Sequence, residues 1–326
     1  MKFLVVLTIF LYFGTISSSR PKPYKAIFNF GDSLSDTGNL LLSGALTFPA
    51  IGNLPYGETF FRRPTGRCSD GRLVIDFIAE AFGLPYLPPY LSLHEKGKYY
   101  QGVNFAVAGA TALDSKFFYQ QKIGSLLSTN DSLSVQLDWF KKFKSSLCNS
   151  NKQGNLIRLR ALIEEGAVEL VVPGNLPIGC SALYLTLFQT PNEENYDPRN
   201  GCLKAFNSFS KYHNEQLKLA LERLRLKYPH ARIIYADYYT SAMRFINTPL
   251  KYGFYNGTLG ACCGGGGPYN FNNSARCGHV GSSVCKDPGS SANWDGVHLT
   301  EAAYRIIAKG LINGHFTTPP LKHHIL

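Results

Sequence analysis

Four short apolar segments, separated by stretches with a helical repeat, place the strongest constraint on how this chain folds. They cover residues 24–30, 102–107, 168–172 and 232–238. Such segments are typical of strands buried on both faces of a parallel sheet, with helices packed above and below. Apolar residues also recur every three or four positions over 203–224 and 303–311, which predicts helices there. This order of elements predicts an α/β protein, a three-layer α/β/α sandwich with a mainly parallel sheet.

The alternation of strand and helix is interrupted between residues 114 and 167. A helical stripe over 134–148 is followed by a polar stretch over 149–155 and by a second helical pattern over 156–163. Two helices therefore follow one another, although each helix of a parallel α/β chain should return to a strand. We infer that a segment containing a strand has been lost near residues 148–155, so that the sheet lacks one central strand. Such a loss leaves backbone groups of the neighbouring strands without hydrogen-bond partners. Unpaired backbone groups destabilise the folded state, so the loss puts the folding of the chain in question.

A serine and an Asp-x-x-His pair, far apart in the chain, supply the groups of a nucleophilic hydrolase. Ser33 directly follows the first predicted strand, at the carboxyl edge of the sheet where ligands of parallel sheets bind. A serine hydroxyl is a weak nucleophile and needs an imidazole base, which a carboxylate holds in the correct tautomer. Asp295 and His298 are three residues apart, so one tight turn can join them. With 8 His and 22 acidic residues, however, such a pair also arises by chance.

Longer segments around these residues are far more specific. Four of them resemble the signature blocks of the plant GDSL esterase/lipases, a branch of the SGNH hydrolases. The blocks are Phe-Asn-Phe-Gly-Asp-Ser-Leu-Ser-Asp-Thr-Gly-Asn at 28–39, Asn-Phe-Ala-Val-Ala-Gly-Ala at 104–110, Val-Val-Pro-Gly-Asn-Leu-Pro-Ile-Gly-Cys at 171–180 and Asn-Trp-Asp-Gly-Val-His-Leu-Thr at 293–300. The resemblance spans roughly residues 26–311, and the stretch 93–139 is similar to the branch that includes hydrolases of alkaloid and phenolic esters.

The resemblance implies a carboxylic ester hydrolase with an SGNH, flavodoxin-like sheet that acts through an acyl-serine. It assigns the nucleophile to Ser33, the base to His298 and the orienting acid to Asp295, and it assigns the oxyanion donors to the N–H groups of Ser33 and Gly109. The implied substrate is a small-molecule or lipid ester, and neither a cofactor nor a metal is implied. Transfer of the acyl group to an alcohol by the same serine is a further possibility.

Other polar residues of these blocks are expected to have structural roles. Asp32 and Asp36 are expected to shape the turn around the nucleophile, and Asn39 to hold the loop. Ser35 is expected to cap the helix that follows. His213 lies within the 203–224 repeat and is expected to be a structural histidine rather than a second base.

One block of the family is absent. The family carries Gly-x-Asn-Asp at the end of a central strand, and the Asn side chain donates to the developing oxyanion. The segment 128–131 contains an Asn-Asp pair, but a Ser stands in place of the Gly and no apolar strand precedes it, which favours a surface loop. Loss of one such donor typically costs ~10²–10³ in rate. Two interpretations follow: an ester hydrolase with weakened activity, or an inactive secreted glycoprotein that retains the fold.

The N-terminus has the layout of a secretory signal peptide. A short basic start is followed by an apolar core over 3–13 and by small residues up to position 19. The alternative, a membrane anchor, is disfavoured because the core is shorter than the roughly 20 residues that span a bilayer. Residues 1–19 are therefore predicted to be removed on secretion, leaving residues 20–326 as a single extracellular domain without a transmembrane segment.

Cysteines and sequons agree with an extracellular location. The chain has 8 Cys, an even number that favours disulfides in an oxidising compartment. Cys180 with Cys202 is a plausible pair, and Cys262, Cys263, Cys277 and Cys285 are expected to pair among themselves. A zinc site formed by these last four is the alternative, although they lack paired Cys-x-x-Cys spacing. Asn-x-Ser/Thr sequons predict glycosylation at Asn130, Asn256 and Asn272.

The net charge of +11 does not indicate nucleic-acid binding. Basic residues are scattered in pairs such as Arg62-Arg63 and Lys141-Lys142, and none forms a block interleaved with aromatic residues. The excess charge instead predicts solubility and a weak attraction to anionic cell-wall polymers or lipid headgroups.

Overall fold

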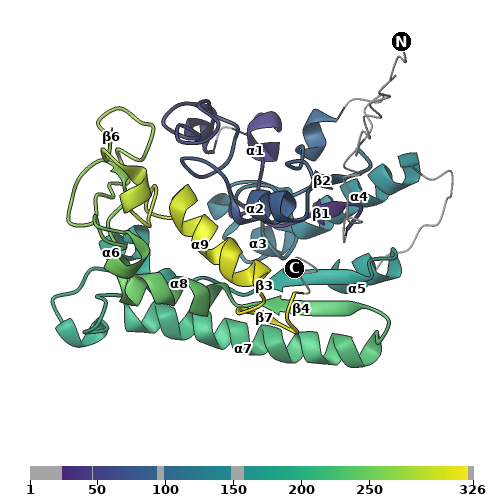
Figure 1. Ribbon diagram of the computed structural model, residues 1–326. Coiled ribbons are helices and arrows are strands. Elements are labelled where there is room, and N and C mark those ends of the chain that lie inside the picture. The colour runs from purple at the N-terminus through teal and green to yellow at the C-terminus, as the bar shows by residue number, and fades with distance from the viewer. Residues whose placement is uncertain (1–23, 46, 94–98, 148–157, 322–326) are drawn as a thin grey trace, which may run out of the picture.

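The structure is a computed structural model that describes residues 24–45, 47–93, 99–147 and 158–321 (Figure 1). The predicted signal peptide, Cys148 and most of the stretch in which a segment was inferred to be lost lie outside these residues.

All four predicted strands are present, within a few residues of their predicted bounds. β1 (Ile27–Asn29) pairs in parallel with β2 (Gly102–Asn104). β3 (Glu169–Pro173) pairs in parallel with β4 (Arg232–Ala236), and the short β7 (Thr317–Thr318) adds antiparallel to β4. The mainly parallel character of the predicted sheet is thus confirmed.

The two parallel pairs do not join into one sheet. β1–β2 and β3–β4–β7 are separate sheets, and within the described ranges no strand lies between β2 and β3. Apolar side chains on both pairs are partly open: Phe28 of β1 is 37% exposed and Val171 of β3 is 41% exposed. This arrangement agrees with the prediction that one central strand is missing.

Helices cover both faces of the strands and give three layers (Figure 1). α7 (Lys204–Lys227) and α5 (Arg158–Glu164) pack on one face of β3–β4, while α2 (Val74–Ala81), α8 (Tyr238–Asn247) and α9 (Glu301–Ile312) pack together on the other. α4 (Leu133–Leu147) covers β2 through Leu137, Phe140 and Phe143. The remaining α-helices and strands of the described residues are α1 (Asn39–Leu42), α3 (Ser115–Gln120), α6 (Ala182–Leu187), β5 (Cys263–Gly264) and β6 (Ser283–Val284). Among the helices of this part of the chain, none combines the length and apolar character needed to cross a bilayer.

The buried face of α7 differs from the predicted one. His213 is exposed and Phe209 is 57% exposed, so the expectation of a structural histidine on an apolar face was wrong. In the first half of the helix the inner face carries buried Asn207 and Asn214 instead, whereas Leu217 and Leu224 of the predicted repeat pack against the core near β3 and β4. Their amides bind backbone groups of the loop after β3, for example Asn207 Oδ1, which accepts from Gly179 N at 2.9 Å. Polar side chains are inside here because they satisfy backbone donors that the loop leaves unpaired.

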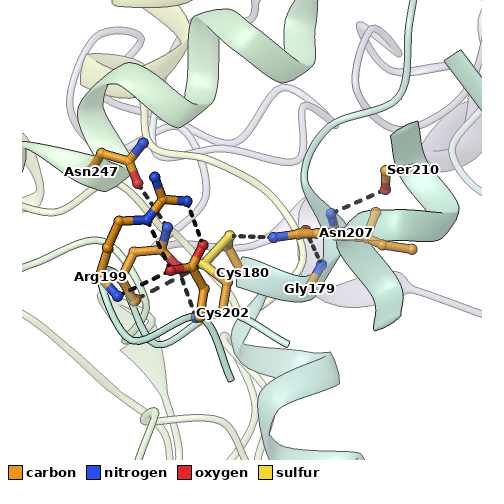
Figure 2. Close-up of a disulfide and its surroundings, with 10 residues drawn as sticks. Gly179, Cys180, Arg199, Cys202, Asn207, Ser210 and Asn247 are labelled. Carbon is orange, nitrogen blue, oxygen red and sulfur yellow. Dashed lines mark hydrogen bonds and ion pairs between the residues drawn. A yellow bond between two sulfur atoms is a disulfide. The ribbon is translucent and has the colours of Figure 1, made fainter. Parts of the chain in front are cut away.

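Three disulfides fix the loops on the side of the molecule where α6 and β6 lie. Cys180–Cys202 joins the loop after β3 to the segment before α7, beside the Gly179–Asn207 contact (Figure 2). Cys262–Cys285 and Cys263–Cys277 close the Gly-rich segment on itself. The predicted pairing of Cys180 and the predicted pairing among the last four cysteines are confirmed, and these sulfurs are therefore not available as zinc ligands. Cys68 is a buried free thiol.

Candidate active site

The turn that carries Ser33 follows β1 and is held from two sides. Gly31 lies at φ 141°, and the carbonyl of Asp32 accepts from the amides of Ser35 and Asp36 at 3.1 and 2.9 Å. Gln136, fully buried on α4, accepts from Gly31 N at 2.9 Å and donates to Gly31 O at 2.8 Å. A residue 105 positions away thus fixes the start of the turn.

The expected structural roles of the neighbouring polar residues are largely confirmed. Buried Asp36 accepts from the amides of Gly38, Asn39 and Leu40 and, across the chain, from Ala108 N at 2.8 Å. Burial raises the pKa of Asp36, and these amide bonds oppose the rise. Asp36 rather than Ser35 therefore serves the first amides of α1, so the expectation that Ser35 caps this helix was wrong. Asn39 Nδ2 donates to the carbonyls of Asn104 and Ala106, which ties the loop to the end of β2.

Asp295 and His298 form the second half of the site in one tight turn. His298 Nδ1 lies 2.7 Å from Asp295 Oδ2, and Asp295 Oδ1 accepts from the amides of Val297 and His298. Gly296 between them lies at φ 98°, and a Cβ there would come within 2.2 Å of the Phe271 ring. Glycine is therefore required at this position for both backbone and space. Thr300 caps the following helix, with its hydroxyl accepting from Ala303 N.

The Asp295–His298 pair is buried and electrostatically coupled. Burial alone would raise the pKa of Asp295, but the charge of His298 and the hydrogen bonds from the turn outweigh it and lower the pKa to about 2. Burial alone would lower the pKa of His298, but Asp295, with a smaller contribution from Cys68, raises it well above its ordinary value of 6.5. The pair thus favours a carboxylate next to an imidazolium.

Tyr56 is a third member of this cluster that the sequence analysis did not identify. Its hydroxyl donates to Asp295 Oδ2 at 2.8 Å, and its ring packs against Trp294 and Phe48. Burial, together with the charge of Asp295, raises the pKa of Tyr56, so the phenol stays protonated and continues to donate.

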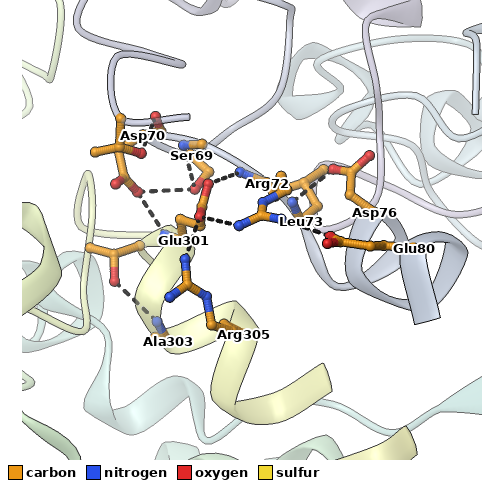
Figure 3. A network of polar contacts seen from close by, with 12 residues as sticks. Ser69, Asp70, Arg72, Leu73, Asp76, Glu80, Glu301, Ala303 and Arg305 are labelled. Atoms are coloured by element: carbon orange, nitrogen blue, oxygen red, sulfur yellow. Dashed lines mark hydrogen bonds and ion pairs between the residues drawn. The ribbon is translucent and has the colours of Figure 1, made fainter. Parts of the chain in front are cut away.

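An ion-pair network supports the loop that carries Cys68 beside His298 (Figure 3). Asp70 Oδ1 accepts from Glu301 N at 2.7 Å, and the Glu301 carboxylate accepts from both Arg72 N and the Arg72 guanidinium. These buried contacts join the loop to the start of α9, directly after the Asp295–His298 turn. The network is structural, and it holds two segments of the site in register.

One cavity brings the two halves of the site together. It has a volume of about 200 Å³ and is lined by Ser33, Gly109, Asp295 and His298 among others. His298 Nε2, the ring nitrogen not used by Asp295, is buried and has no hydrogen-bond partner among the described residues. Each residue predicted for the nucleophile, base, acid and oxyanion site therefore borders the same space.

Of the other predicted positions, Gly109 lines this cavity and the three sequon asparagines do not. Gly109 has φ 79°, and a Cβ there would clash with the Ser128 side chain. Ser128 lines the cavity, whereas Asn130, two residues on, is exposed in a loop and does not line it. Asn256 and Asn272 are also exposed. In the described part of the chain, no group of three or more His, Cys, Asp or Glu side chains is placed to hold a metal ion.

Fold and site together define an α/β protein with a buried Asp–His pair and a serine at the carboxyl edge of its parallel strands. A family model described as GDSL-like Lipase/Acylhydrolase matches residues 27–311. The chain belongs to this family, as its signature blocks predicted, and is a carboxylic ester hydrolase.

Curated relatives match along almost the whole chain. GDSL esterase/lipase At5g45910 of Arabidopsis thaliana is 50% identical, covering 98% of each chain. Sinapine esterase of Brassica napus is 46% identical, covering 96% of this chain and 93% of its own. The alignment with the first relative runs over 365 residues, whereas this chain has 326, so the relative contains residues with no counterpart here.

Proposed function

We propose that this protein hydrolyses carboxylic esters through an acyl-serine at Ser33, with His298 as base and Asp295 as its orienting acid. The observation that carries the proposal is that His298 and Ser33 line one cavity while the buried Nε2 of His298 has no hydrogen-bond partner among the described residues. Nδ1 is already engaged by Asp295, so Nε2 is the nitrogen left to exchange a proton with substrate.

In the first step, Ser33 Oγ bonds to the ester carbonyl carbon while its proton passes to His298 Nε2. The N–H groups of Ser33 and Gly109 stabilise the oxyanion. The bond to the alcohol oxygen then breaks as Nε2 returns the proton to that oxygen. A water molecule repeats the sequence on the acyl-serine and releases the acid. For a transferase, an alcohol would replace that water.

The missing Gly-x-Asn-Asp block supports a weakened enzyme. The gap between the two parallel pairs and the longer alignment with the relative both support loss of an internal segment. We infer that this segment held the strand and the oxyanion Asn. Without that donor, the rate is expected to be ~10²–10³ lower than with the complete set. Sequencing the transcript across codons 140–160 tests whether the deletion is real.

The second candidate function is that of an inactive glycoprotein retaining the fold, which the split sheet favours. Hydrolysis of a short p-nitrophenyl ester separates the two. The expected result is a low rate that Ser33→Ala abolishes and that Ser35→Ala, the neighbouring hydroxyl, leaves unchanged. Equal rates in the original chain and Ser33→Ala would refute the serine mechanism. Product that depends on added alcohol would identify acyl transfer.

Secretion and modification form a separate part of the proposal. The leader at 1–19 is proposed to be cleaved, leaving a single domain over 20–326 with glycans at Asn130, Asn256 and Asn272. Three disulfides and three exposed sequon asparagines support this route. Mass spectrometry of secreted protein, before and after enzymatic removal of glycans, tests the new N-terminus and each site. The charge of +11 supports weak attraction to anionic cell-wall or lipid surfaces, which retention on an acidic matrix at low salt would check.

A further inference from the structure

The wall of the cavity is largely apolar and aromatic. Leu40, Phe48, Leu183, Phe271 and Val297 line it, and the Phe48 ring stacks on the His298 ring with centroids 6.4 Å apart. At about 200 Å³ the space is smaller than typical small-molecule sites, which are roughly 300–1,000 Å³. It can therefore enclose the atoms around one ester bond, while the rest of a larger substrate lies at the mouth.

Charge in this cavity is strongly asymmetric. Apart from the Asp295–His298 pair, the only charged side chain among the described lining residues is Arg276. The Asp295 carboxylate is already saturated by His298, Tyr56 and two amides. Arg276 is thus the one cationic group at the cavity that does not belong to the proposed catalytic set.

Arg276 is held in place at the edge of the cavity. Asn273 Oδ1 accepts from both Nε and Nη2 of its guanidinium, and Nη1 has no hydrogen-bond partner among the described residues. The next residue, Cys277, lines the cavity and is bonded to Cys263. Arg276 is exposed, yet its charge acts on the buried hydroxyl of Tyr56 and lowers the pKa of that group against the rise from burial. A cation at the edge of the cavity therefore contributes a positive potential to the space where the ester would bind.

We propose that Arg276 selects esters that carry a carboxylate on the part of the substrate lying at the cavity mouth, and disfavours esters with a cation there. This inference rests on the proposed function, since it concerns the same cavity. A carboxylate accepts hydrogen bonds from a guanidinium in a geometry that neutral groups match poorly. A quaternary ammonium at the same place meets a like charge with no acidic side chain among the described lining residues left to offset it.

The test uses three aryl acetates that differ in the charge of one para substituent. They are 4-acetoxybenzoate, its neutral methyl ester and 4-acetoxy-N,N,N-trimethylanilinium. Because their intrinsic reactivities differ, each is compared between the original protein and Arg276→Gln, and the ratio of kcat/KM values cancels that difference. Arg223→Gln, an exposed arginine of α7 that does not line the cavity, is the control for net charge.

For Arg276→Gln we expect kcat/KM for the anionic probe to fall about fivefold, the scale of an ion pair open to solvent. The value for the neutral probe should stay constant and that for the cationic probe should rise. Arg276→Lys should restore part of the anionic preference, and added salt should reduce it. Equal ratios for all three probes in Arg276→Gln would overturn this inference and leave the esterase proposal intact. Hydrolysis of all three probes at equal rates by the original protein and by Ser33→Ala would instead refute the proposed function.

Discussion

Tyr56 provides the sharpest test of how the site is built, because Tyr56→Phe removes a single hydroxyl from a buried charge. The Tyr56 side chain has no solvent exposure, and its hydroxyl lies 2.8 Å from Asp295 Oδ2. The same oxygen lies 2.7 Å from His298 Nδ1. The substitution keeps the ring, and therefore its packing against Trp294, and deletes only the donor.

The size of the effect follows from the charge of the acceptor. A hydrogen bond to a charged group contributes about 1.5–3 kcal/mol. We therefore expect Tyr56→Phe to lower the free energy of unfolding by about 2 kcal/mol at pH 7. With one donor fewer, Asp295 becomes more basic and attracts the proton of His298 more strongly. The pKa of His298 should rise further, and its inflection in the pH–rate profile should move to higher pH.

Urea unfolding monitored by fluorescence measures the first quantity, and kcat/KM for p-nitrophenyl acetate from pH 5 to 10 measures the second. Tyr255→Phe is the matched control, since Tyr255 is 74% exposed. The reasoning is refuted if Tyr56→Phe unfolds with a free energy equal to that of Tyr255→Phe. It is equally refuted if the inflection moves to lower pH.

Three further predictions concern the two turns of the site. In the original protein, kcat/KM should rise with pH through an inflection above pH 6.5. The reason is that His298 acts as a base only after losing a proton, and its pKa is raised above 6.5. An inflection below pH 6.5 in the pH–rate profile would contradict the coupling between His298 and Asp295. Gly296→Ala should destabilise the protein by about 1–3 kcal/mol in urea unfolding and abolish hydrolysis, because the new methyl group meets Phe271; unchanged stability would show that the turn relaxes. Gln136→Ala removes both hydrogen bonds to Gly31. It should lower kcat at least tenfold, roughly the effect of a small displacement of a nucleophile, with little change in KM. An unchanged kcat would assign Gln136 to stability alone.

Features that depend on neighbours in the chain could be predicted from the sequence. The strands β1 to β4 follow from apolar runs, and the Asp295–His298 contact follows from a spacing that one turn can close. The interruption after residue 114 could be recognised because two helical patterns follow one another, and the unjoined β1–β2 and β3–β4 pairs agree with it. The family blocks added the prediction that Ser33 is the nucleophile.

The face that α7 buries was predicted correctly only in part: Leu217 and Leu224 of the predicted repeat pack against the core, whereas Phe209 is exposed. Apolar periodicity assumes that the inner face of a helix meets only apolar groups. Here the inner face meets the loop after β3, whose amides need acceptors, so Asn207 and Asn214 are buried and Phe209 is exposed. The helix was predictable from its own residues, but its orientation depended on unpaired backbone groups more than 25 residues away.

The groups that complete the site lie far from it along the chain and carry no local pattern. Tyr56 reaches Asp295 across 239 positions, and Gln136 reaches Gly31 across 105. Neither is marked by a motif, because their roles arise only when separate segments pack against each other. The chain alone therefore specified the strands, the two turns of the proposed site and the disulfide-rich segment, each set by short-range geometry. Packing between distant segments decided which side chains orient the charges and line the cavity, since hydrogen bonds and burial depend on distance in space rather than along the chain.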